Sequence, residues 1–190
     1  MNQDRIANCR ANVHGMIMKM DLTQPPDLVF VTCGGTIDKI YFDAKGEYAV
    51  GPPQVAGLLE EANVGFRYEI VPVVRKDSLE MTVEDREAVR AVIAGQGCRR
   101  VVVTHGTDTM IQTALALRGL EGRTIVLTGS MQPARFRVSD AEFNIGTAVT
   151  AAQILPPGVY VAMNGRIFDP EHSRKNVAAN RFEGLDSLGN

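Results

Sequence analysis

Short apolar segments recur along this chain, and stretches with the apolar spacing of helices separate them. This alternation constrains the fold more than any other feature, because it indicates successive strand–helix–strand units. Such units build a mainly parallel sheet, so we predict a doubly wound α/β fold with helices on both faces of the sheet. The predicted strands cover residues 28–31, 67–74, 101–103, 124–128 and 159–163, and the predicted helices cover residues 52–63, 82–94, a segment ending near residue 120, and 139–154.

Hydroxyl residues follow three of the predicted strands. Thr36 comes after the first strand, Thr107 after the third and Ser130 after the fourth. Right-handed crossovers place the carboxyl ends of parallel strands at one edge of the sheet, where ligands of open α/β folds usually bind. We therefore expect these three side chains to line one site.

Thr36 follows a pair of glycines, Gly34 and Gly35, that ends the first strand. Glycines let the backbone turn sharply and let another group approach it closely. On its own, the position favours a turn hydroxyl that bonds local backbone, the commoner role of a threonine after glycine. A phosphate-binding loop is disfavoured because both the GxGxxG and the GxxxxGK[ST] spacings are absent from the sequence.

Thr107 and Asp108 open the next predicted helix, and capping that helix would be an ordinary role for them. The same helix start offers backbone N–H groups that attract a carboxylate or an oxyanion, so a functional role stays open. His105 precedes a glycine and has no serine or cysteine partner in its motif, which favours a local structural role. Cys33, at a strand end, is expected to be a small buried hydrophobe rather than a nucleophile.

The composition is that of an ordinary globular domain, with 45% hydrophobic and 22% charged residues among 190. We expect residues 27–190 to form a single domain, preceded by a poorly ordered extension, residues 1–26. Residues 37–51 form a connection long enough to be functional or mobile. The tail from residue 164 to residue 190 is polar and weakly patterned.

Net charge and cysteine content limit the kinds of partner and site that the sequence predicts. The net charge of −2 gives no electrostatic reason to expect nucleic acid or an anionic membrane as a partner. No apolar stretch has the length of a membrane span or the pattern of a signal peptide. The three cysteines include no CxxC pair, so we predict neither a zinc site nor a disulfide framework, and we expect a cytoplasmic location.

Two longer motifs resemble a known family. Residues 32–38, Thr-Cys-Gly-Gly-Thr-Ile-Asp, and residues 102–110, Val-Val-Thr-His-Gly-Thr-Asp-Thr-Met, resemble the signature motifs of the bacterial-type L-asparaginase/glutaminase family. The resemblance implies a Rossmann-like fold, that of the family's N-terminal domain, in a short member that lacks the C-terminal domain. It spans about residues 28–176, with shorter matches at residues 77–81, 128–133, 139–140 and 163–175.

The resemblance implies hydrolysis of the side-chain amide of L-asparagine to L-aspartate and ammonia, with L-glutamine as a weaker substrate. Thr36 would be the nucleophile that forms an acyl-enzyme. In a second cluster, Lys175 would keep Thr107 polarised, Thr107 would activate or position the attacking group, and Asp108 would hold the α-amino group of the substrate. A threonine hydroxyl needs such help, because it is a poor nucleophile until a neighbouring group takes its proton.

Other site residues follow from the same resemblance. Tyr41, on the connection after the first motif, would assist the nucleophile, and Tyr48 matches less well. Ser78 would bind the α-carboxylate of the substrate. Backbone N–H groups of the Gly34–Gly35 and Gly129–Ser130 turns would stabilise the oxyanion. The implied substrate-binding positions are Gly35, Ser78, Leu79, Gly106, Thr107, Asp108 and Ser130.

Three residues depart from the family pattern. Cys33 stands where threonine is usual, Asp38 replaces a small residue, and Leu79 stands where many members have a polar side chain that contacts the substrate. The C-terminal domain of two-domain members supplies an acidic residue to a neighbouring subunit, and another acid would have to replace it. The candidates are Asp43, Glu47, Glu142 and Glu171, among which the sequence does not choose.

The resemblance also implies an assembly and leaves two other functions open. It implies no metal or organic cofactor, and a homodimer or dimer of dimers, because family active sites are shared between subunits. The departures allow a degenerate member that binds amino acids as a sensor, although an intact set of catalytic side chains argues against this alternative. A further alternative is an amidase that acts on a larger amidated substrate.

Overall fold

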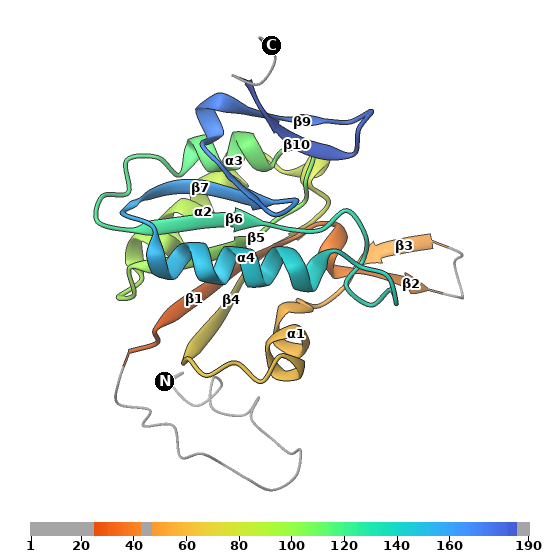
Figure 1. Ribbon diagram of the computed structural model, residues 1–190, viewed down its shortest axis with the longest axis horizontal. Coiled ribbons are helices and arrows are strands. Elements are labelled where there is room, and N and C mark those ends of the chain that lie inside the picture. The colour runs from red at the N-terminus through yellow and green to blue at the C-terminus, as the bar shows by residue number, and fades with distance from the viewer. Residues whose placement is uncertain (1–24, 43–46, 186–190) are drawn as a thin grey trace, which may run out of the picture.

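The computed structural model describes residues 25–42 and 47–185, with the backbone alone for residues 41, 42, 47 and 48 (Figure 1). Its centre is a six-stranded sheet in which five strands are parallel and the last, β8, runs antiparallel to β7. The order across the sheet is β4 (Tyr68–Lys76), β1 (Leu28–Gly34), β5 (Arg100–Thr104), β6 (Thr124–Thr128), β7 (Gly158–Met163) and β8 (Arg166–Phe168). The predicted doubly wound α/β fold is confirmed.

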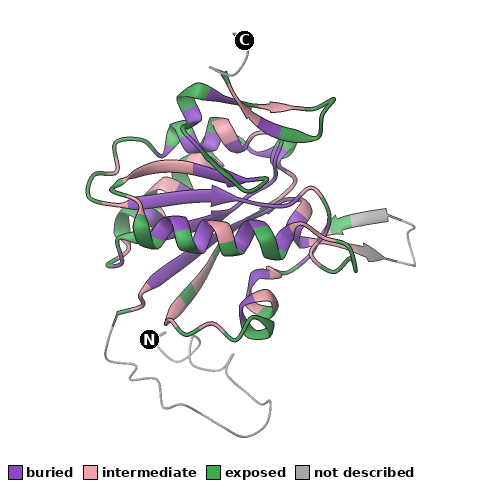
Figure 2. Ribbon diagram, in the orientation of Figure 1, coloured by how far each residue is buried: buried purple, intermediate pink, exposed green. Residues whose placement is uncertain are grey.

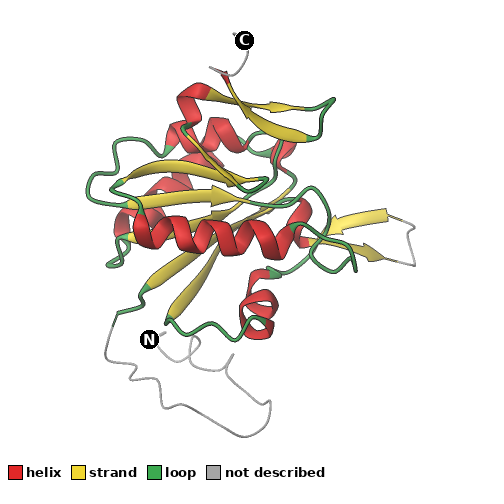
Figure 3. Ribbon diagram, in the orientation of Figure 1, coloured by secondary structure: helices red, strands yellow, loops and turns green. Residues whose placement is uncertain are grey.

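Helices cover both faces of this sheet (Figure 3). The helices α2 (Val83–Gly95) and α3 (Met110–Ala116) pack on one face, and α1 (Val55–Glu61) and α4 (Ala141–Ile154) pack on the other. Successive side chains of a strand point to opposite faces, so Val101 and Val103 enter one core and Val102 enters the other. The central strands are accordingly buried on both sides (Figure 2), which explains their continuous apolar runs.

The strand order contains one reversal of direction. In chain order, the five parallel strands lie 2-1-3-4-5 across the sheet, so the connections after β1 and β5 leave toward opposite faces. In folds of this kind, ligands bind outside the carboxyl ends of the strands at the reversal. Thr36 follows β1 and Thr107 follows β5, so both lie at this point of the sheet edge.

The connection over residues 37–51 contains a hairpin that the sequence analysis did not predict. Strands β2 (Lys39–Phe42) and β3 (Glu47–Val50) pair antiparallel, with Tyr41 opposite Tyr48 (Figure 1). Each strand has only four residues, too few for an alternation to stand out among Asp, Lys and Gly. The hairpin extends away from the main sheet and is not part of it.

The tail also has more structure than expected. Besides β8, it forms the antiparallel pair β9 (Ser173–Asn176) and β10 (Arg181–Gly184). Phe168 and Phe182 are both buried, with ring centroids 6.3 Å apart, and they attach this polar segment to the core. Two isolated aromatic residues show no periodicity, so the sequence pattern missed these strands.

Helix and strand limits otherwise shift by a few residues. Helix α3 ends at Ala116 instead of near residue 120, and α1 begins at Val55, after the prolines that were expected to open it. No helix in the described ranges combines the length and apolarity needed to cross a membrane. The predicted extension, residues 1–26, lies outside the described residues except for Pro25 and Pro26.

Candidate active site

Glycines bring three of the motifs into backbone contact. A Cβ atom on Gly35 would lie 2.3 Å from the nitrogen of Gly106, and a Cβ atom on Gly106 would lie 2.6 Å from Oγ of Ser78. No side chain fits at those distances, and Gly35 also has a φ of +87°, which L side chains rarely adopt. Glycine therefore packs the turns after β1 and β5 directly against the segment after β4.

Thr36 begins a short 3-10 turn, Thr36–Asp38, at the end of β1. The turn is held by bonds from the Asp38 N–H to the Gly35 carbonyl (3.1 Å) and from the Ala134 N–H to the Ile37 carbonyl (3.1 Å). Thr36 is only partly buried, and its hydroxyl has no hydrogen-bond partner among the described residues. The alternative of a turn hydroxyl bonded to local backbone finds no such bond here.

Lys175, Thr107 and Asp108 form a compact cluster at the same edge of the sheet. The Nζ of Lys175 donates to Oγ1 of Thr107 (2.7 Å) and to Oδ1 of Asp108 (2.8 Å). The Lys175 side chain is 15% exposed and the Asp108 side chain 41% exposed, while Thr107 is buried. Because the ammonium donates to the Thr107 oxygen, the Thr107 hydroxyl proton remains available for a further partner.

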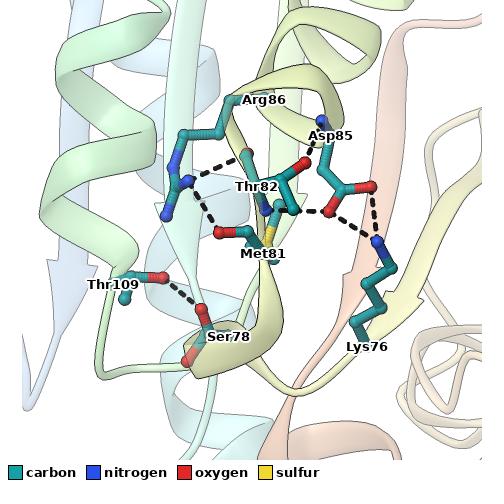
Figure 4. A network of polar contacts seen from close by, with 7 residues as sticks. All are labelled: Lys76, Ser78, Met81, Thr82, Asp85, Arg86 and Thr109. Atoms are coloured by element: carbon teal, nitrogen blue, oxygen red, sulfur yellow. Dashed lines mark hydrogen bonds and ion pairs between the residues drawn. The ribbon is translucent and has the colours of Figure 1, made fainter.

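Ser78 presents a buried hydroxyl with no hydrogen-bond partner among the described residues. The 3-10 turn that carries it is held on both sides. Asp77 accepts from the Leu79 N–H (3.2 Å), and Thr109 Oγ1 donates to the Ser78 carbonyl (2.7 Å), as Figure 4 shows for the second contact. A buried hydroxyl is usually paired, so an unpaired one beside the glycine contact indicates a place for a polar ligand group.

The predicted substrate-binding position Leu79 lies at the surface. Leu79 is 73% exposed, and it follows Ser78 in the same short turn. Lys39, at the base of the hairpin, forms an ion pair with Asp77 (2.8 Å) that fixes this turn from the side of the first motif.

His105 has a structural role, as the sequence analysis favoured. Its Nε2 lies 2.8 Å from the Thr113 hydroxyl and its Nδ1 lies 2.7 Å from the Gly106 carbonyl oxygen. Arg86 donates to the Thr113 oxygen (3.1 Å), so the Thr113 proton goes to Nε2, and we assign the ring proton to Nδ1. Burial lowers the pKa of His105 to about 4, so the neutral ring orients the Gly106 peptide at neutral pH.

The loop after β6 borders the same edge of the sheet. A Cβ atom on Gly129 would lie 2.2 Å from the His105 carbonyl oxygen, so the ends of β5 and β6 are also in backbone contact. The Ser130 side chain is buried and donates to the carbonyl of Gln132 within its own loop. Sequence reasoning missed Asn144, which donates from Nδ2 to the Gly129 carbonyl (3.0 Å) and is fully buried on α4.

The structure bears on two expectations from the sequence, one about the oxyanion donors and one about Cys33. The Gly35 N–H already donates to the Lys76 carbonyl (3.0 Å), so the first turn does not offer this N–H to an oxyanion. Burial raises the pKa of the Cys33 thiol to about 12, which keeps it protonated and unreactive, in line with its expected role as a buried hydrophobe.

The tyrosines and two of the acidic candidates have side chains outside the described residues. Tyr41 and Tyr48 lie opposite each other in the hairpin, but their side chains, like those of Asp43 and Glu47, are among these. Glu142 is exposed on α4, and Glu171 is exposed and pairs with Arg118 (2.9 Å). Asp169, Glu171 and His172 are close enough together to face one cation, but Arg118 already contacts both carboxylates.

Comparison with known proteins agrees with the fold and the motifs. Residues 27–189 match the family described as Asparaginase, N-terminal. The chain is 31% identical over 173 residues to an L-asparaginase of Bacillus licheniformis, covering 85% of this chain and 53% of that protein. It is 39% identical over 118 residues to one subunit of the glutamyl-tRNA(Gln) amidotransferase of Methanococcus vannielii, covering 60% of this chain and 27% of that protein.

A solved structure gives the same result. The thermostable L-asparaginase from Thermococcus kodakarensis superposes with a TM-score of 0.71 at 30% sequence identity, covering 83% of this chain and 50% of that one. The chain thus spans about half the length of the L-asparaginases it matches. The family match over most of the sequence and the shared fold lead to one conclusion: this chain belongs to the asparaginase family, and it corresponds to the N-terminal domain of that family.

Proposed function

We propose that this protein hydrolyses the side-chain amide of L-asparagine through an acyl-enzyme on Thr36. The observation that carries the proposal is the contact of Lys175 with both Thr107 and Asp108, at the edge of the sheet where Thr36 also lies. The Thr107 hydroxyl is polarised by an ammonium, Asp108 is an anion, and the Thr36 hydroxyl has no partner among the described residues. Together these groups are what acyl transfer from an amino-acid amide requires.

The reaction proceeds in two acyl transfers. Oγ of Thr36 attacks the side-chain amide carbon of the substrate, the carbon–nitrogen bond breaks, and the nitrogen leaves as ammonia after taking up the threonine proton. Water then attacks the resulting ester, and L-aspartate leaves as the hydroxyl of Thr36 is restored. Thr107 is held by Lys175, and its own hydroxyl proton remains free to form a hydrogen bond. Thr107 therefore positions the attacking group through that hydrogen bond.

Two groups in the site suit the charged end of an amino acid. Asp108 keeps an exposed carboxylate beside the Lys175 ammonium, where it can accept from a substrate α-ammonium. The buried Ser78 hydroxyl has no partner in the described residues and can donate to a substrate α-carboxylate. Tyr41 is proposed to assist Thr36 from the hairpin, and Ser130 to border the substrate from the loop after β6.

Ammonia release from L-asparagine tests the proposal. We expect the Thr36→Ala and Thr107→Ala variants to lose at least about 10³-fold in kcat, as removal of a nucleophile or its activating group does. Thr150→Ala removes an exposed hydroxyl of α4 and serves as the matched control, with activity close to wild type. Full activity in both active-site variants would refute the mechanism.

L-glutamine and larger amides are alternative substrates. The match to a protein named as part of a glutamyl-tRNA(Gln) amidotransferase favours a second candidate, an amidase that works within such a transfer system. Ammonia release from L-asparagine by the purified chain alone supports the first candidate. Release from L-glutamine only, or only when a partner protein is added, supports the second.

The proposed assembly is a homodimer or dimer of dimers. The proposal follows from the implied sharing of the site between subunits and is tested by sedimentation velocity at several protein concentrations. A monomer that retains full asparaginase activity would contradict it.

A further inference from the structure

Asp38 is a buried carboxyl that the mechanism above does not use, and it lies two residues after the nucleophile. We propose that Asp38 is a positioning residue, whose carboxylate ties the Thr36 turn to the segment between the hairpin and α1 and so keeps the nucleophile and the hairpin base in one arrangement. The inference rests on the proposed function, because the reaction it serves is acyl transfer to Thr36.

Asp38 holds this segment through both its side chain and its backbone. Its Oδ1 accepts from the Gln54 N–H (2.8 Å), and its carbonyl oxygen accepts from the Gly51 N–H (2.7 Å). Gly51 follows β3 directly and Gln54 directly precedes α1. The two bonds therefore close the loop at the base of the hairpin and fix it to the third residue of the Thr36 turn.

A third segment joins the same contact. The Nε of Arg135 donates to Oε1 of Gln54 (2.8 Å), and the neighbouring Ala134 N–H donates to the Ile37 carbonyl (3.1 Å). Arg135 belongs to the loop that also carries Ser130. Asp38 thus lies where the first motif, the hairpin base and the loop after β6 meet.

Helix capping alone does not account for this residue. A capping aspartate usually keeps its carboxylate in contact with water, whereas Asp38 is only 2% exposed, and its carboxylate has one hydrogen-bond donor within the described ranges. Serine and asparagine are equally common caps and would accept from the Gln54 N–H without burial of a charge. The position therefore carries a charged acceptor at a larger desolvation cost than a cap requires.

The surroundings of Asp38 make its charge sensitive to pH. Burial raises its pKa to about 7, against the opposing effects of the Gln54 N–H and the Arg75 guanidinium. The Cys33 thiol at the end of β1 is uncharged at this pH, and Lys39 is paired with Asp77. From the loop after β6, Arg135 reaches Asp38 only through Gln54.

Activity and stability then respond to pH in opposite directions. Above pH 7 the ionised carboxylate forms the stronger bond to the Gln54 N–H, so the active arrangement is favoured as pH rises. Because the folded pKa exceeds the unfolded value near 4, the contribution of Asp38 to stability is fully present below pH 4 and is lost as pH rises through 7. A purely structural carboxyl would show the stability trend without the activity trend.

The test compares kcat and KM for ammonia release between about pH 5.5 and 8.5 in the wild type, Asp38→Asn and Asp77→Asn. We expect wild-type kcat to fall about fivefold as pH drops through 7, since a bond to an ionised acceptor is about twice as strong as one to a neutral acceptor. Asp38→Asn retains an acceptor of the same shape, so the fold is kept, but kcat stays at the low value and this pH step disappears.

Asp77→Asn is the matched control. Asp77 is also an acid at the hairpin base, but its pKa lies below its usual value, so this variant keeps the pH step near 7. A step that persists in Asp38→Asn, or one that vanishes in Asp77→Asn, overturns the proposal.

A second readout does not depend on activity. The backbone amide resonance of Gln54 should shift with a midpoint near pH 7 in the wild type and show no such midpoint in Asp38→Asn. If the chain releases no ammonia from any amide, the proposed function fails while this titration still reports on Asp38. If ammonia is released but the Gln54 amide is insensitive to pH, the inference about Asp38 is wrong and the proposed function stands.

Discussion

The two turns that carry Thr36 and Thr107 differ in how completely their polar groups are paired. Around Thr107, the hydroxyl oxygen is held by Lys175, and the adjacent Gly106 peptide is oriented by His105. Around Thr36, the backbone is fixed but the hydroxyl has no partner within the described residues. The Thr107 turn is therefore preorganised from within the domain, whereas the hydroxyl of Thr36, the proposed nucleophile, still needs a group that takes its proton.

The glycine contact that joins the two turns is the most sensitive place to disturb both of them at once. Gly35→Ala would place a methyl group 2.3 Å from the Gly106 nitrogen, at a φ of +87°. We expect a loss of more than about 4 kcal/mol of unfolding free energy, or failure to fold, because backbone atoms on both sides have to move. Urea denaturation followed by circular dichroism measures the change.

Gly57→Ala is the matched control for that variant. Gly57 lies within α1 and has no atom within 4 Å of an added Cβ. Alanine should stabilise this helix by about 0.5–1 kcal/mol. Equal stability of the two variants would show that the Gly35–Gly106 contact does not hold the turns together.

Removing the ammonium disrupts the preorganised Thr107 turn alone. Lys175→Met should reduce kcat by about 10²–10⁴-fold, the usual effect of losing a group that assists proton transfer, while the fold is kept. Arg174→Met alters an exposed neighbour in β9 and should remain near wild type. Steady-state kinetics with L-asparagine would contradict the assignment if both variants behaved alike.

A variant of Ser78 tests the proposed contact with the α-carboxylate of the substrate, next to the Thr107 turn. Ser78→Ala should raise KM for L-asparagine about tenfold with little change in kcat, because it removes a donor to the substrate carboxylate. Thr104→Val removes another buried hydroxyl that has no partner in the described part of the chain, at the end of β5, and controls for burial. If Thr104→Val raises KM equally, the unpaired Ser78 hydroxyl is not a substrate contact.

The sheet and the two strand-end turns could be predicted from the sequence because their patterns are local. Strands β1, β5 and β6 are continuous apolar runs, and each ends at a glycine or a hydroxyl residue that interrupts the run. The strand order, with its reversal between β1 and β5, was not predicted. It depends on which helix covers which face, and no short segment encodes that choice.

The residues that complete the site were harder to find, because their roles depend on distant segments. Lys175 gains significance only when Phe168 and Phe182 attach the tail to the core and bring β9 to Thr107. Asp38 looked like a departure from the family pattern, and its burial arises from the hairpin base and the start of α1 together. The family resemblance indicated Lys175 but offered nothing for Asp38.

The proposed function depends on the acylation of Thr36 during turnover. Acid quenching of the enzyme with L-asparagine, followed by mass spectrometry of the intact protein and of its peptides, detects that intermediate. We predict an aspartyl adduct on the peptide that contains Thr36, and none in the Thr36→Ala variant. Ammonia release without any adduct on that peptide, or an adduct on Thr107 instead, would contradict the proposed mechanism.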